Sequence, residues 1–88
     1  MPRFLIERTV GTLTAEQIET GSRRSIEVVG TMSGVVWIRS YYSEAEGKIY
    51  CEYEAPNVEA IREHARLAGL PVDRILEVSL ELSPAMFR

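Results

Sequence analysis

Two residue types that bind metal ions or act as nucleophiles occur once each in this sequence. They are the histidine His64 and the cysteine Cys51. An imidazole and a thiolate that lie close together can ligate a soft or borderline metal ion, or the imidazole can activate the thiolate for nucleophilic attack. The structural alternative is a buried histidine, bonded to a carbonyl or a tyrosine hydroxyl, beside an inert buried thiol. Because one histidine and one cysteine cannot complete a tetrahedral or octahedral shell, a metal site also needs carboxylates or residues from a second subunit.

A second group of residues combines carboxylates, aromatic rings and one guanidinium, and we expect its members on one face of a sheet. The group comprises Glu7, Trp37, Arg39, Tyr41, Tyr50, Glu52 and Glu77. A carboxylate in these surroundings can serve as a general base, because burial and neighbouring carboxylates raise its pKa. The alternative is a solvated face whose aromatic side chains form the contact between two copies of the chain.

The hydrophobic pattern predicts the elements that carry these residues. Patterns typical of strands occupy positions 3–9, 35–42, 48–54 and 74–82. A helix begins at Thr14, which has capping-box spacing from Gln17, and it ends within residues 30–34. A second helix covers residues 58–68 and ends at Gly69. The order of elements predicts an α+β, ferredoxin-like βαββαβ fold, in which a four-stranded antiparallel sheet carries both helices on one face.

Alternation along the strands predicts which residues each face of this sheet carries. The helix-covered face is expected to take Phe4, Ile6, Val36, Ile38, Ile49, Cys51, Tyr53, Leu76, Val78 and Leu80. For the two middle strands to share that face, the loop between them must contain four or six residues. His64 flanks the apolar stripe of the second helix, so we expect it to point toward the sheet near Cys51. The uncovered face then collects the acidic and aromatic group, and the expected strand order 4-1-3-2 places Glu7 and Glu52 on its central strands.

The composition of the 88-residue chain excludes several classes of function. Its 10 Lys and Arg residues against 13 Asp and Glu residues give a net charge of -3, so we expect no binding to nucleic acid or to an anionic membrane. The sequence shows no signal-peptide core and no membrane-spanning run, and we expect a cytoplasmic protein. The length predicts a single domain over residues 1–88.

The small size of the chain also predicts a homodimer. A domain of this size buries only roughly 60% of the surface of its unfolded chain, so pairing with a second copy adds stability. We expect the interface on the uncovered sheet face or its edges, with Trp37 as the largest buried anchor. Like-charge repulsion between the glutamates there predicts a gap filled by water or by a cation. The expected partners are a second copy and a metal ion or small molecule.

Three stretches of the chain resemble one protein family, namely R-F-L-I-E-R at residues 3–8, R-S-Y-Y-S at 39–43 and C-E-Y-E-A-P-N-V-E-A-I-R-E-H-A-R-L-A-G-L-P at 51–71. The chain resembles the small bacterial nickel-binding, ferredoxin-like proteins long catalogued as a domain of unknown function. The resemblance implies a ferredoxin-like dimer that binds nickel. The residues of this chain to which the resemblance extends the family's pattern are Glu7, Arg8, Ser40, Tyr41, Cys51, Glu54 and His64. Among these, His64, Cys51 and Glu54 are the expected metal ligands.

Two functions from different classes follow from these observations. The first is a homodimeric protein that binds a divalent transition metal, with His64 as the nitrogen ligand and Cys51 or nearby carboxylates completing the shell. The identity of that metal as nickel is what the resemblance implies. The second is a small enzyme, similar to dimeric α+β-barrel monooxygenases and isomerases, whose active site lies where two uncovered sheet faces meet. Its pocket would be formed by the acidic and aromatic group.

Overall fold

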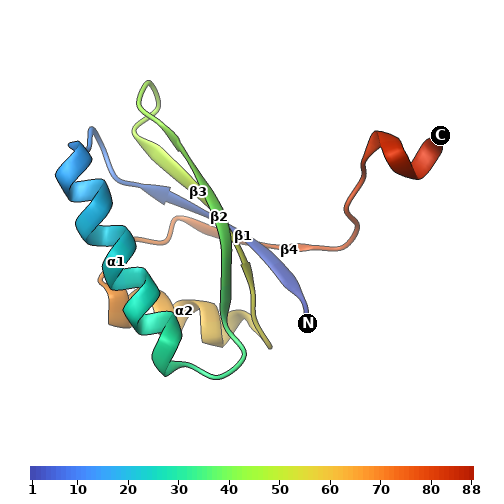
Figure 1. The fold of residues 1–88 in the computed structure, drawn as a ribbon, viewed down its shortest axis with the longest axis horizontal. Helices are drawn as coiled ribbons and strands as arrows, with labels where there is room; N and C mark the ends of the chain where they lie inside the picture. The colour runs from blue at the N-terminus through green and yellow to red at the C-terminus, as the bar shows by residue number, and fades with distance from the viewer.

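The computed structural model describes residues 1–88 and confirms the predicted ferredoxin-like order of elements (Figure 1). The four strands are β1 (Arg3–Thr9), β2 (Val36–Ser43), β3 (Lys48–Glu54) and β4 (Arg74–Val78). The helices are α1 (Ala15–Thr31), α2 (Val58–Ala68) and a short 3-10 helix, η1 (Pro84–Phe87). The sheet order is β2-β3-β1-β4, as predicted, and all three strand pairs are antiparallel. Figure 1 shows α1 and α2 together on one side of the sheet.

Local hydrogen bonds explain where the two long helices begin. The Thr14 side chain accepts from the backbone N–H of Gln17 at 3.1 Å, and the Gln17 side chain accepts from the backbone N–H of Thr14 at 2.9 Å. This reciprocal pair is the capping box that the sequence predicts. At α2, the side chain of Asn57 accepts from the backbone N–H of Ala60 at 2.9 Å. The helix ends at Gly69, whose φ of 69° lies in the left-handed region.

The hydrophobic core lies between the helices and the sheet face that they cover. Phe4 and Ile6 of β1 are each only 1% exposed, and Tyr53 of β3 and Ile61 of α2 are equally buried. The cross-strand pairs Phe4 with Tyr53 and Ile6 with Cys51 hold these residues on the same face. The predicted core of β1 and β3 is thereby confirmed.

Strand β2 departs from the predicted faces because its register with β3 shifts between Trp37 and Arg39. Arg39 pairs with Glu52, whereas Trp37 pairs with Tyr53, so one residue of β2 is inserted between them. The hairpin loop does contain four residues, 44–47, as predicted. The inserted residue, however, reverses the order in which side chains of β2 alternate between the two faces. Trp37 therefore lies on the helix-covered face, where it packs against the core. The prediction that Trp37 lies on the uncovered face was wrong, and so was the burial of its neighbour Val36, which is 46% exposed.

Strand β4 is shorter than predicted, and its faces are inverted. Ile75 pairs with Ile6 and packs against the core, whereas Leu76 pairs with Leu5 on the uncovered face and is 48% exposed. Glu77 pairs with Phe4, so the prediction that it lies on the uncovered face was wrong. The misleading signal was the alternation of Leu76, Val78, Leu80 and Leu82, because the last two of these residues lie beyond the end of the strand at Val78.

The chain beyond β4 projects away from the body of the molecule. Figure 1 shows residues 79–88, including η1, extending past the end of the sheet on the side far from α1. Four large apolar side chains of this segment are exposed, namely Leu80, Leu82, Met86 and Phe87. None of the helices has the length and hydropathy needed to cross a membrane.

Candidate functional site

The single histidine lies in a hydrogen-bonded group beneath α1. His64 belongs to α2 and is fully buried, with its Nε2 atom 3.3 Å from the Ser25 hydroxyl oxygen and 3.4 Å from the Ser25 carbonyl oxygen. Its ring lies 5.0 Å from the ring of Tyr53, whose hydroxyl is 3.1 Å from the same serine oxygen. Because the carbonyl oxygen can only accept, this geometry favours the proton on Nε2. The Nδ1 atom has no hydrogen-bond partner.

The surroundings of His64 lower its pKa below the ordinary value for histidine. The main cause is burial, which removes water from the charged form. The positive charge of Arg8 acts in the same direction, and the hydrogen bond to the backbone of Ser25 opposes both. His64 is therefore held as a neutral imidazole, which is the protonation state of a metal ligand and of a structural histidine alike.

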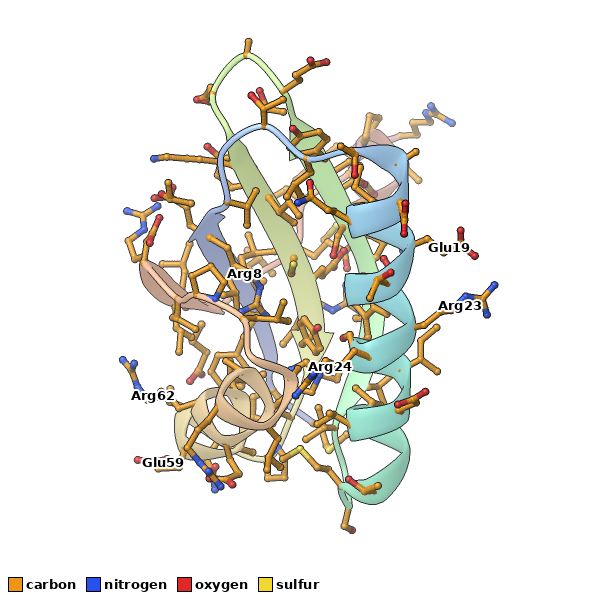
Figure 2. The ribbon with its side chains drawn as sticks, turned by 90° about the vertical axis from the view of Figure 1, so that its left-hand side faces the viewer. Arg8, Glu19, Arg23, Arg24, Glu59 and Arg62 are labelled. Carbon is orange, nitrogen blue, oxygen red and sulfur yellow. The ribbon has the colours of Figure 1, made fainter.

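The single cysteine lies against a buried arginine rather than against the histidine. The Nε atom of Arg8 donates to the Cys51 sulfur at 3.4 Å, and its Nη1 donates to the Pro71 carbonyl oxygen at 2.9 Å. The guanidinium carbon of Arg8 also lies 5.9 Å from the centre of the Tyr53 ring. Arg8 is only 1% exposed, and its Nη2 atom has no partner. Figure 2 shows Arg8 in the interior, whereas the labelled Glu19 and Arg23 of α1 point outward.

The structure does not assemble the predicted metal ligands within one chain. Cys51 and Glu54 lie three positions apart on β3, so their side chains point to opposite faces of the sheet. Glu54 lies on the uncovered face, with its carboxylate 3.5 Å from Arg3. His64 and Cys51 have different hydrogen-bond partners in the core. No three His, Cys, Asp or Glu side chains of the chain converge on a point where they could hold a metal ion.

The uncovered sheet face, which we call the open face, contains a hollow of about 210 Å³. Four residues of the predicted acidic and aromatic group line it, namely Glu7, Tyr41, Tyr50 and Glu52. Arg39 lies on the same face, where its Nε atom is 3.3 Å from Glu52. Trp37 and Glu77 do not contribute, for the reasons of register given above.

The charges of the open face are more balanced than the sequence predicts. Glu52 lies 3.1 Å from Arg3 as well as 3.3 Å from Arg39, and Glu7 lies 3.3 Å from Lys48. The hydrogen bond and the charge of Glu7 raise the pKa of Lys48. The prediction of a strongly acidic face was wrong because, of the basic residues there, it counted Arg39 but not Arg3 and Lys48, which alternation places on the same face as the glutamates.

No separate function was predicted for Arg8, although the strand pattern around it indicates that its side chain is buried. Phe4, Ile6 and Arg8 occupy alternate positions of one strand, so a strand over residues 3–9 places all three on the buried face. A charge on a predicted core face indicates either a buried ion pair or a ligand site. Ser25 is the one buried residue of α1, and its helical spacing from Ile18 and Val29 places it on the same side of the helix as these two apolar residues.

Comparisons with known proteins agree with this fold. The family described as "Nickel responsive protein SCO4226-like" matches the chain over residues 4–78. Among solved structures, the chain is similar to SCO4226 from Streptomyces coelicolor A3(2), with 27% sequence identity and a TM-score of 0.81. That likeness covers 91% of this chain and 99% of the other. No curated protein matches the chain.

A second solved structure, of protein YJCS, is similar over 91% of this chain and 97% of its own. The TM-score is 0.56 and the sequence identity is 14%, so this likeness shows the fold alone.

Proposed function

Because the chain belongs to the SCO4226-like family of nickel-responsive proteins, we propose that it binds nickel as a homodimer, with metal ligands drawn from two copies. The observation that carries the proposal is the family match, which covers β1 through β4. The second copy is needed because the residues of one chain do not fit a metal site of three or more ligands. In a twofold dimer, each ligand that lies near the axis is present twice.

The open face is the surface that can supply such ligands. Glu7 and Glu52 line its hollow, and their side chains are 23% and 18% exposed to solvent, so a partner or an ion can reach them. His64 is fully buried and cannot extend to a second copy without rearrangement of α2. We therefore assign the shared ligands to the carboxylates of the open face, rather than to His64, Cys51 and Glu54.

The ion pairs of these carboxylates do not prevent metal binding. Glu7 is held by Lys48, and Glu52 is held by Arg3 and Arg39. Ion pairs that remain in contact with solvent contribute little to stability, because water screens the attraction and the long basic side chains lose entropy. A divalent cation between two copies can replace the basic partners, which are long side chains able to move back into water.

Calorimetric titration of the metal-free protein with Ni(II) tests the proposal, using protein purified without a metal-affinity column. We expect saturable binding, a larger dimer fraction in sedimentation when Ni(II) is present, and at least tenfold weaker binding in Glu52→Gln. The matched control is Glu19→Gln, which removes an exposed glutamate that pairs with Arg23 on α1, far from the open face. It should bind Ni(II) as the parent does.

The outcomes separate metal binding from its location. No binding heat in the parent protein would refute nickel binding itself. Binding that is lost in His64→Gln and retained in Glu52→Gln would refute the open face and favour the buried histidine. The alternative of a dimeric α+β-barrel enzyme rests on the same hollow, and the family and structural matches name no enzymatic activity in its support.

A further inference from the structure

A larger cavity lies on the other side of the sheet, between α1 and the helix-covered face. It has a volume of about 320 Å³, within the range of small-molecule sites. Nine of its 15 lining residues are hydrophobic, and they include Leu13, Ile18, Trp37 and Ile49. We call this cavity the inner pocket. Its mixture of apolar walls and a few polar groups is typical of a binding site for a small organic molecule.

The polar wall of the inner pocket contains the buried guanidinium of Arg8. None of the seven ion pairs of the chain includes this arginine, so its charge is buried without a carboxylate partner. Two of its nitrogen atoms donate to Cys51 and Pro71, and the third, Nη2, donates to nothing. An isolated buried charge with an unused donor is strongly unfavourable unless a partner of opposite charge completes it.

We infer that the inner pocket binds a small organic monocarboxylate, with its carboxylate on Arg8 and its apolar body along α1. A carboxylate supplies the missing charge and accepts from Nη2. The walls formed by Ile18, Trp37 and Ile49 suit an aliphatic chain or an aromatic ring, because they offer apolar surface. A phosphate is a poorer match, since a dianion needs more donors than one free nitrogen provides.

This inference is independent of the proposed nickel site. The inner pocket and the open face lie on opposite faces of the same sheet, and a positively charged wall repels a metal cation. Cys51 also lines the inner pocket, where its sulfur already accepts from Arg8.

The protein carries its own reporter for this test, because its only tryptophan, Trp37, lines the inner pocket. Sodium octanoate is the probe, and octan-1-ol is its uncharged counterpart with the same chain length. We expect octanoate to change Trp37 fluorescence saturably and to bind at least tenfold more tightly than octan-1-ol in calorimetry. Equal affinity for both probes, or no binding of octanoate at millimolar concentration, would overturn the inference.

A pair of glycine substitutions on α1 locates the binding. Gly21 lines the inner pocket and Gly30 does not, and a Cβ added at either position meets no atom within 4 Å. Gly21→Leu should fill the cavity and weaken octanoate binding at least tenfold, whereas Gly30→Leu should leave it unchanged. Unchanged binding in Gly21→Leu would overturn the location.

Substitutions of Arg8 test the role of its charge. Arg8→Met should abolish the preference for octanoate over octan-1-ol, and Arg8→Lys should retain part of it, because a lysine keeps the charge without the planar fork. Circular dichroism shows whether both variants fold. If Arg8→Met does not fold, the glycine pair and the two probes still decide the outcome. A folded Arg8→Met that keeps the full preference would refute the assignment of Arg8.

Discussion

Three polar side chains surround the Tyr53 ring in the middle of the core. Ser25 contacts its hydroxyl, His64 lies against its ring, and Arg8 lies above it. Two nitrogen atoms in this group remain unpartnered, His64 Nδ1 and Arg8 Nη2. The two residues differ because a histidine can lose its charge on burial, whereas a guanidinium in a protein stays charged. Burial therefore produces a neutral imidazole at one position and an unmatched cation at the other.

The lowered pKa of His64 predicts how stability depends on pH. In the unfolded chain, His64 takes up a proton near its ordinary pKa of about 6.5. In the folded chain, burial lowers the pKa, so the native state binds fewer protons in the interval below that value. Stability from this group is thus complete above about pH 6.5, and it falls as the pH decreases toward the lowered pKa. The slope from one group cannot exceed about 1.4 kcal/mol per pH unit.

Urea unfolding at pH 7.5 and pH 5.5 measures this effect. The parent protein should lose more free energy of unfolding between the two pH values than His64→Gln does, at equal protein concentration. Glu63 has a lowered pKa because of its hydrogen bond to Arg66, but as a carboxylate on the outside of α2 it acts mainly at lower pH. Equal pH dependence in parent and variant would show that His64 does not titrate differently in the two states.

At the scale of elements, the bulge in β2 changes the role of Trp37. Its ring packs against the core, and its Nε1 donates to the Ser40 hydroxyl at 2.9 Å. Trp37→Ala should therefore lower the free energy of unfolding by roughly 2 to 3 kcal/mol, somewhat less than a fully buried tryptophan. Trp37→Phe keeps most of the ring and should cost about 1 kcal/mol for the lost hydrogen bond. Denaturant unfolding gives both values.

The same variants distinguish a core role from an interface role for this tryptophan. If Trp37 anchored a dimer, as the sequence suggests, Trp37→Ala would shift the sedimentation equilibrium toward monomer with little loss of stability in the monomer. The observed position predicts the opposite pattern, a loss of stability without a direct change in association.

Substitution of glycine by alanine should have opposite effects on stability at two positions. Gly21 lies inside α1, where an added Cβ meets open space, so Gly21→Ala should stabilise the protein by roughly 1 kcal/mol. Gly69 ends α2 with a φ of 69°, which a side chain disfavours, so Gly69→Ala should destabilise it by roughly 1 kcal/mol. Thermal unfolding of the two variants should show melting temperatures on opposite sides of the parent value. A shift in the same direction for both would contradict the argument.

The elements themselves were predictable because their signals are local. The capping box at Thr14, the glycine after α2 and the alternation in β1 each depend on residues close together in the sequence. The bulge at Trp37 and the register of β4 depend on which partner a strand meets, which local alternation does not contain. The changes of face at Val36 and Trp37 come from the bulge, and those at Leu76 and Glu77 come from the register of β4.

At the scale of the whole molecule, the candidate sites were only partly predictable. Four members of the acidic and aromatic group do line the hollow of the open face, because β1 and β3 pair as expected. The ion pairs of these glutamates with Arg3 and Lys48 were not predicted, although the same alternation brings both basic residues to that face. The inner pocket was not predicted, because a cavity depends on the distance between α1 and the sheet rather than on a residue pattern.

The open face leads to the last prediction, which concerns assembly. Leu5 of β1 and Leu76 of the edge strand β4 form a cross-strand pair on this face, and both are more than 40% exposed, which leaves apolar surface that a second copy can cover. Leu76→Lys would place two charges in that interface, so the dissociation constant of the dimer should rise by roughly 100-fold. Leu67→Lys on α2, at a leucine with 39% exposure, is the control and should dimerise as the parent does. Sedimentation equilibrium at micromolar concentration measures all three, and a Leu76→Lys protein that dimerises as tightly as the parent would exclude the open face as the interface.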